Sequence, residues 1–125
     1  MEYNLPFGKV IIHSESLLEV IPKEGVDIDK SDAEEANIFL EKVMTQPYGV
    51  LVNLTNDFSL DFAGSLIIGN PSNEIKAAFL TVRPTSEMAM TTVIQAQKIS
   101  FPDKEIRFFD VREEALKWLA ELPNS

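Results

Sequence analysis

The hydrophobic and polar positions in the first third of the chain predict a β-hairpin followed by a long helix. Residues 9–14 and 17–22 are short apolar runs separated by a polar turn, which favours two antiparallel strands. Beyond a polar loop, apolar residues recur at helical spacing and should face the sheet. They are Ala33, Ala36, Leu40 and Val43, and Pro47 ends the predicted helix.

Capping residues mark the start of two predicted helices. For the first helix, Ser31 and Glu34 have the spacing of a capping box, and Asp29 is the alternative N-cap. Near the other end of the chain, Asp110 and Glu113 have the same capping-box spacing and predict the start of a terminal helix.

The rest of the chain alternates between predicted strands and helices. Residues 48–55 are almost continuously apolar, as in a strand that is covered on both faces. The elements that follow are a short helix over 60–69, a buried strand over 75–82, a helix over 85–98, a strand over 106–109, and a terminal helix with Ala115, Trp118, Leu119 and Leu122 on its inner face. This order predicts an α/β fold: an N-terminal hairpin, then alternating helices and strands in a mostly parallel mixed sheet, with about five strands and four helices.

Length and composition indicate a single globular domain over residues 1–125. The 125 residues, 45% of them hydrophobic, are enough to bury one core. The absence of cysteine excludes a disulfide framework, thiol catalysis and thiolate metal sites. The N-terminus shows no basic stretch followed by an apolar core, so we expect no signal peptide and a cytoplasmic location.

The net charge of −9 narrows the classes of partner. Such a surface repels phosphate backbones and anionic headgroups, so we expect no nucleic-acid binding and at most weak, hydrophobic membrane contact. No apolar run approaches the ~18 residues of a membrane-spanning helix.

Three segments resemble the bacterial SpoIIAA-like group, which is related to STAS domains and combines STAS with Sec14 (CRAL-TRIO) character. They are SLLEVIPKEGVDIDKSDAEEA, YGVLVNLTNDFSLDFAGS and the closing IRFFDVREEALKWL. The last is the most specific, with an aromatic strand, an acidic turn, an Ala-Leu pair and a Trp-Leu pair. The resemblance implies a single SpoIIAA-like (STAS-like) domain over nearly the whole chain.

In STAS-type anti-sigma-factor antagonists, the turn after the central strand carries Asp-Ser-Ser/Ala-Gly, and a partner kinase phosphorylates the first serine. The matching residues of this chain are Asp61, Phe62, Ala63 and Gly64. Because Phe62 has no hydroxyl, the resemblance carries over the backbone turn and not the phosphorylation switch. Ser59 and Ser65 flank the position and are either modified or ordinary capping and surface residues.

The residues of this turn have structural as well as functional explanations. Asp61 is a candidate for binding a partner's cation or a ligand, although helix capping is favoured. Gly64 suits either the close approach of a ligand or tight packing of the helix on the sheet. Phe62 either lines a groove or belongs to the core.

Other candidate chemistry is better explained by local structure. His13 is the only histidine, and neighbouring Ser14 should point to the opposite face of the strand, so a partly exposed histidine is favoured over a catalytic base. Asp27, Asp29 and Asp32 resemble a fragment of a calcium loop but lack its glycine and glutamate, which favours a helix start. We expect no metal site, no nucleotide-binding motif and no cofactor.

The predicted helix over 85–98 is a further candidate surface, because Met88 and Met90 lie in a segment with few charges. Methionine surfaces adapt to varied apolar partners. The helix could cover an apolar ligand, form a homodimer or touch a membrane, while burial against the sheet is the ordinary alternative.

Three functions follow from these observations. The first is a non-enzymatic binding or regulatory module that presents residues 56–65 to a protein partner or small ligand. The alternative, from the Sec14 side of the resemblance, is an apolar-ligand or lipid-binding protein with a cavity between the helix over 85–98 and the sheet. The third, an enzyme that uses Asp57 and Asp61 as paired carboxylates, is disfavoured because both suit turn or capping roles.

Overall fold

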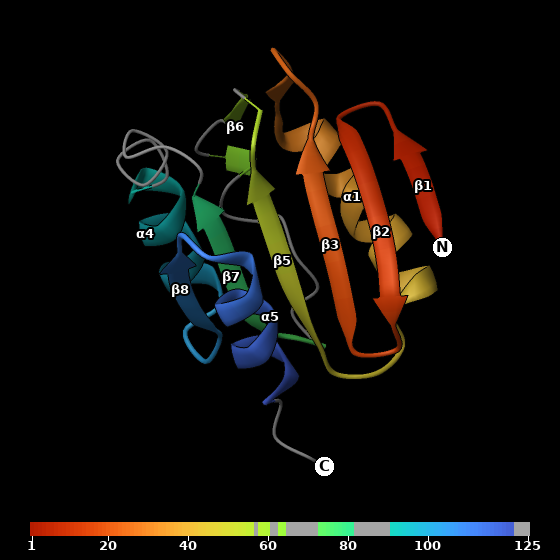
Figure 1. Ribbon diagram of the computed structural model, residues 1–125. Coiled ribbons are helices and arrows are strands. Elements are labelled where there is room, and N and C mark those ends of the chain that lie inside the picture. Colours follow the sequence, from red (N-terminus) through yellow and green to blue (C-terminus); the bar gives the residue numbers. More distant parts are fainter. Residues whose placement is uncertain (57, 61–62, 65–72, 82–90, 122–125) are drawn as a thin grey trace.

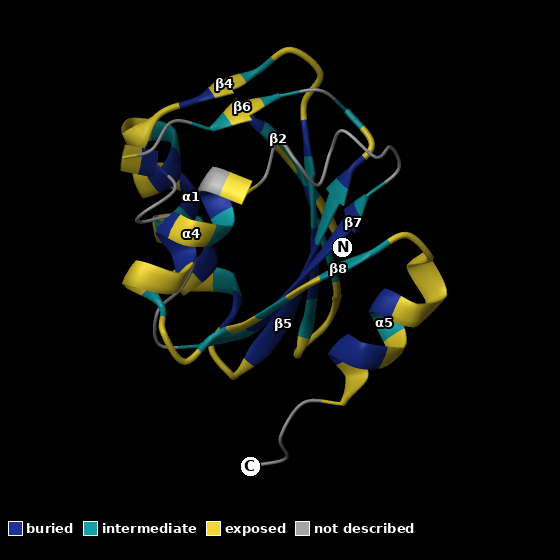
Figure 2. Ribbon diagram, turned by 90° about the vertical axis from the view of Figure 1, so that its left-hand side faces the viewer, coloured by how far each residue is buried: buried dark blue, intermediate teal, exposed yellow. Residues whose placement is uncertain are grey.

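The computed structural model describes residues 1–56, 58–60, 63–64, 73–81 and 91–121, which form three layers (Figures 1 and 2). A mixed six-stranded sheet is the middle layer. Helices α1 (Lys30–Val43) and α4 (Thr91–Ser100) cover one face of the sheet, and α5 (Arg112–Ala120) covers part of the other. None of these described helices is long and apolar enough to cross a membrane.

The sheet joins an antiparallel N-terminal part to a parallel C-terminal part. Its spatial order is β1-β2-β3-β5-β7-β8. The strands are β1 (Glu2–Leu5), β2 (Gly8–Ser14), β3 (Leu17–Pro22), β5 (Tyr48–Leu54), β7 (Glu74–Thr81) and β8 (Glu105–Phe109). β1 to β3 pair antiparallel, whereas β3, β5, β7 and β8 pair parallel. The predicted α/β fold, with its N-terminal hairpin and mostly parallel sheet, is confirmed.

A small second sheet lies at the carboxyl ends of the parallel strands. β4 (Asp27–Ile28) follows β3 and pairs in parallel with β6 (Ser59–Leu60), which follows β5. Leu60 therefore lies in a strand, and the prediction that a helix begins there is wrong. Two residues per strand are too few for hydrophobic periodicity to reveal. Positions 63–64 are helical, and the other residues predicted for this helix, 61–62 and 65–69, lie outside the described residues.

Strand β1 is an addition that the sequence did not predict. None of its residues is buried, so no apolar run marks it. The backbone amide of Ile12 donates to the carbonyl of Met1 at 2.8 Å, and the ring of Tyr3 meets Phe39 of α1 edge-on at a centroid distance of 5.1 Å. Backbone pairing, this aromatic contact and the packing of Leu5 against the core hold this edge strand in place.

The caps of the helices differ in part from the predictions. Asp29 is the N-cap of α1 and forms a capping box with Asp32, so Asp29, not Ser31, was the correct choice. The N-cap of α5 is Val111, which makes no side-chain cap, so the predicted cap at Asp110 is wrong. The first residue of the helix, Arg112, directs its side chain toward the carboxylate of Glu19 on β3.

The inner faces of the helices agree with the hydrophobic pattern. Ala33, Ala36 and Leu40 of α1 are buried, as are Ala115, Trp118 and Leu119 of α5. Leu122, which was assigned to the same inner face, lies outside the described residues.

Strand β7 carries one buried lysine within its apolar sequence. The ammonium of Lys76 donates to the backbone carbonyls of Trp118 and Glu121 at 3.1 and 3.0 Å. It also lies 4.6 Å from the centre of the Trp118 ring. The free carbonyls at a helix C-terminus attract a cation, so this lysine fixes the end of α5 against the sheet.

Candidate functional site

Most of the residues predicted to form a site lie outside the described residues: Asp57, Asp61, Phe62, Ser65, Met88 and Met90. Of the others, Gly64 is buried, and Ser59 lies in β6 with an exposed side chain. The Ser59 hydroxyl donates to the carboxylate of Asp27, and its amide donates to the carbonyl of Val26 at 2.9 Å. Ser59 thus joins β6 to β4, and the role of Phe62 stays a prediction.

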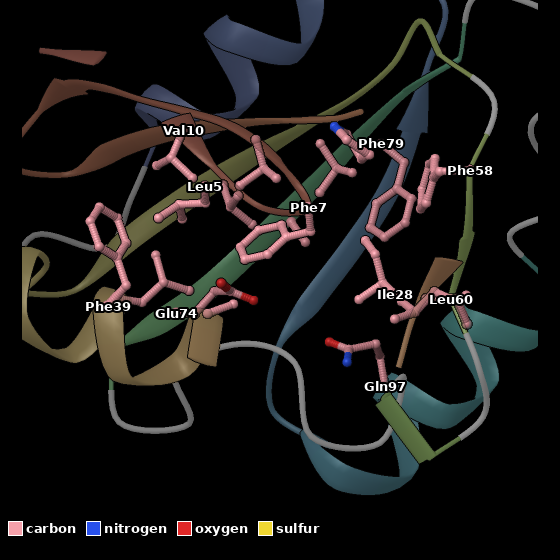
Figure 3. A pocket seen from close by; sticks show the side chains of 18 of the residues that line it. Leu5, Phe7, Val10, Ile28, Phe39, Phe58, Leu60, Glu74, Phe79 and Gln97 are labelled. Carbon is pink, nitrogen blue, oxygen red and sulfur yellow. The ribbon is translucent and has the colours of Figure 1, made fainter. Parts of the chain in front are cut away.

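An apolar cavity of about 100 Å³ lies between the sheet and helices α1 and α4 (Figure 3). On the sheet side, Val50 and Ala77 are neighbours on β5 and β7. On the helix side, Ala36 and Leu40 come from α1 and Val93 from α4. Aliphatic side chains from β1, β2 and β3 and several phenylalanine side chains from other parts of the fold complete most of the lining. The cavity therefore lies beneath α4, the described part of the helix predicted over 85–98, and also beneath α1.

Polar groups on one wall of the cavity are paired with one another. The Glu74 carboxylate accepts from Lys104 at 2.7 Å and from the Tyr48 hydroxyl at 3.0 Å. The Lys104 ammonium also donates to the amide oxygen of Gln97 and lies 4.6 Å from the centre of the Phe101 ring. The Lys104 and Glu74 side chains are only 3% and 7% exposed. Burial, and secondly the charge of Glu74, raises the pKa of Tyr48, which therefore stays protonated.

The two ends of the cavity differ in chemistry because of the strand directions. Glu74 begins β7, and Lys104 immediately precedes β8, so the paired polar groups lie at the amino ends of the parallel strands. At the carboxyl ends, Ile28 of β4, Leu60 of β6 and neighbouring Phe58 line the cavity. One end is thus closed by polar groups, and the other is bordered by apolar side chains on a small sheet.

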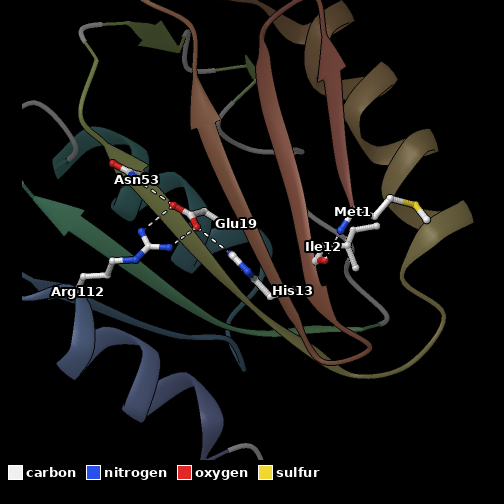
Figure 4. A network of polar contacts seen from close by, with 6 residues as sticks. All are labelled: Met1, Ile12, His13, Glu19, Asn53 and Arg112. Carbon is white, nitrogen blue, oxygen red and sulfur yellow. Dashed lines mark hydrogen bonds and ion pairs between the residues drawn. The ribbon is translucent and has the colours of Figure 1, made fainter.

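A charged cluster lies on the opposite face of the sheet (Figure 4). Glu19 of β3 is 1% exposed, and Arg112 contacts both oxygens of its carboxylate, at 2.6 and 2.9 Å. His13 Nε2 lies 2.8 Å from one oxygen, and the Asn53 amide donates to the other at 3.1 Å. This contact agrees with a partly exposed strand histidine, whose side chain is 33% exposed.

Hydrogen bonding outweighs burial in setting the charge of Glu19. Burial alone would raise the pKa of this carboxyl, but hydrogen bonds from Arg112, His13 and Asn53, together with the charge of Arg112, lower it from 4.5 to about 2. Glu19 is therefore ionised in the folded protein at neutral pH. This cluster was not predicted from the sequence, although a glutamate at the centre of the apolar run LLEVIP is a signal of a buried, paired charge.

The depressed pKa of Glu19 predicts an acid-dependent loss of stability. The unfolded chain binds the proton more readily, so the stabilisation is complete above pH 4.5 and is lost as the pH falls toward 2. Urea unfolding of the wild type and of Glu19→Gln should show a stability difference that shrinks by about 2 kcal/mol between pH 5 and pH 2.5. A stability difference that stays constant between pH 5 and pH 2.5 would contradict a lowered pKa of Glu19.

The aspartates considered for calcium binding have structural partners. Asp27 accepts from Ser59, and Asp29 and Asp32 cap α1. In the described part of the chain, no group of three or more His, Asp or Glu side chains is arranged to hold a metal ion.

Comparison with known proteins identifies the fold. No protein-family model and no curated protein sequence matches the chain. A solved structure of an uncharacterised protein of the DUF3478 family with a SpoIIAA-like fold, from Shewanella loihica PV-4, is similar over nearly its whole length. The TM-score is 0.61 at 20% sequence identity, and the match covers 95% of this chain and 98% of that chain. The chain described here therefore has the SpoIIAA-like α/β fold that its sequence predicted.

Proposed function

We propose that this protein is a non-enzymatic binding module that takes up a small apolar ligand, or the hydrocarbon part of a larger one, in the cavity beneath α1 and α4. The observation that carries the proposal is the cavity of about 100 Å³ with its aliphatic and aromatic lining. An apolar pocket with a few convergent polar groups is the usual form of a small-molecule site.

Filling a cavity of this size with a ligand would stabilise the protein. At ~24 cal/mol per Å³, a cavity of this volume lowers the stability of a fold by about 2 kcal/mol, which a well-fitting apolar ligand can recover. An engineered cavity of ~150 Å³ lined by similar side chains binds benzene and xenon. The present cavity is about two-thirds of that size and suits ligands of that class.

Because the polar groups on one wall of the cavity are already paired with one another, the cavity favours a hydrocarbon over a charged ligand. The Lys104 ammonium faces Glu74, Gln97 and the Phe101 ring, so a ligand carboxylate would have to displace existing partners. His13, the only histidine, contacts Glu19 on the other face of the sheet. No imidazole is therefore available in the cavity for acid–base chemistry, which supports a binding role over catalysis.

Benzene and xenon are suitable first probes, with methyl NMR as the measurement. We expect saturable shifts of the Ala77, Val50 and Val93 methyl signals, while Ala115, buried on the opposite face, stays unchanged. Ala77→Leu should fill the cavity and abolish the shifts, whereas Ala120→Leu, the same change at an exposed position, should leave them intact.

A second variant that fills less of the cavity keeps the test interpretable if Ala77→Leu fails to fold. Val93→Ile adds only one methylene to the lining, so it should weaken benzene binding while the protein stays folded. If neither probe shifts the cavity methyls of the wild type, the proposed function is wrong.

Docking of a protein partner on residues 56–65, homodimer formation, weak membrane contact and a cytoplasmic location all remain predictions from the sequence. They are compatible with a binding module, because the same fold can carry a ligand cavity and a docking surface.

A further inference from the structure

We infer that the small sheet β4–β6 is the gate of the apolar cavity, and that a ligand enters past it with its apolar end first. The inference rests on the proposed function, since it concerns the route into the same cavity. Two observations carry it: the contrast between the two ends of the cavity and the slight attachment of β4 to β6.

The polar end of the cavity is an unfavourable entrance. Opening it would separate the Lys104 ammonium from the Glu74 carboxylate, two groups that are almost completely buried. Breaking such a pair leaves a charge in an apolar environment. At the carboxyl end, the side chains of Ile28 and Leu60 that border the cavity are apolar, and the hydrogen bond between the Asp27 and Ser59 side chains joins exposed residues. The carboxyl end is therefore the easier route.

Among the described residues at the carboxyl end, the pairing of β4 with β6 is short and lies near solvent. β4 and β6 pair over two residues each, at Asp27–Ser59 and Ile28–Leu60. The hydrogen bonds from Ser59 to Val26 and Asp27 hold the two strands together, and both Asp27 and Ser59 are exposed. The central strand β5, in contrast, is paired on both sides along most of its length. Short, exposed pairings open at low free energy.

Figures 2 and 3 show where this pair lies. In Figure 2, β4 and β6 lie side by side at the top of the view. In Figure 3, the labelled side chains of Ile28, Leu60 and Phe58 lie together at one side of the pocket. A local separation of β4 from β6 would thus open the cavity without disturbing the six-stranded sheet.

Amide hydrogen exchange tests the opening without any ligand. The Ser59 amide, which donates to Val26, should exchange at least about 100-fold faster than the amides of β5. Asp27→Ala removes the acceptor of the Ser59 hydroxyl and should accelerate the Ser59 exchange further. If the Ser59 amide is as strongly protected from exchange as the amides of β5, the proposed gate is wrong.

A reversible crosslink tests the gate during ligand uptake. The chain has no cysteine, so Asp27→Cys combined with Ser59→Cys at register partners creates a single disulfide. Oxidation should slow benzene association and dissociation at least about tenfold, measured by relaxation dispersion of the Ala77 methyl, and reduction should restore both rates. The dissociation constant should stay within about twofold, because both rates change together.

The matched control crosslinks strands away from the cavity. Glu2→Cys with Ile11→Cys joins register partners of β1 and β2, and its oxidation should leave the benzene rates unchanged. Benzene binding with equal rates in oxidised and reduced Asp27–Ser59 variants overturns the gate and leaves the proposed function standing. Absence of benzene binding to the wild type overturns the proposed function itself, so the two failures are distinguishable.

Discussion

Replacing Arg112 with alanine is expected to destabilise the protein by about 3 kcal/mol, because the variant leaves the buried carboxylate of Glu19 without its cation. The loss of stability should be larger when the arginine is removed than when the glutamate is removed. The Glu19 side chain is 2% exposed, whereas that of Arg112 is 43% exposed and can turn to water if its partner is removed. Urea or guanidinium unfolding of Arg112→Ala and of Glu19→Leu should therefore show the larger loss for the arginine variant.

Two further variants separate the ion pair from the packing of Arg112. In the double variant Glu19→Leu/Arg112→Ala, most of the loss seen in Arg112→Ala should be recovered, because no buried charge remains. Arg107→Ala removes an arginine that lies over the Trp118 ring at 5.2 Å and should cost below about 1 kcal/mol. Equal losses for Arg112→Ala and Arg107→Ala would rule out a special role for the Glu19 pair.

Lys104→Met is expected to have an effect of similar size, about 3 kcal/mol, measured by the same unfolding experiment. Methionine keeps the length and packing of the side chain but removes the charge that faces Glu74. Among the residues that the structure describes, the Tyr48 hydroxyl, at 3.0 Å, would then be the remaining donor to the Glu74 carboxylate, whose side chain is 7% exposed. The substitution therefore leaves a buried carboxyl group without its counter-charge, which destabilises the fold.

The chain offers a matched control for this substitution. Lys9 pairs with Glu2 at 3.5 Å, but the two side chains are 42% and 52% exposed. Lys9→Met should therefore change stability by less than about 1 kcal/mol. Adding Glu74→Gln to Lys104→Met should recover part of the loss, because glutamine can still accept from Tyr48 without carrying a charge. A loss for Lys104→Met as small as that for Lys9→Met would contradict the interpretation of this wall as a buried ion pair.

The fold could be predicted because it depends on patterns that are local in sequence. The apolar stretch that became β5 and the helical spacing of Ala33, Ala36 and Leu40 both report burial directly. β1 and the β4–β6 pair carry no such local pattern, because their short strands depend on long-range backbone pairing. The capping-box spacing of Asp110 and Glu113 predicted a cap that the structure does not have, since α5 begins one residue later, after Val111.

The candidate site was less accessible to sequence reasoning. The cavity is the volume left between side chains of several strands and two helices, so no single motif encodes it. The signals that were present are charged residues within apolar runs: Glu19 in β3 and Lys76 in β7. Both side chains are buried and have polar partners. A charged residue within an apolar run therefore indicates a partner that is distant in sequence, but the pattern does not identify that partner.

The contact between Glu19 and Arg112 also affects the order in which the molecule assembles. The two residues are 93 positions apart, so during synthesis the N-terminal hairpin leaves the ribosome long before its counter-ion exists. Until α5 is made and docks, the carboxylate is better solvated than buried, which discourages early packing of β3 into a finished sheet. Contacts of such high sequence separation slow folding, and we expect the closing of this pair to be among its last steps.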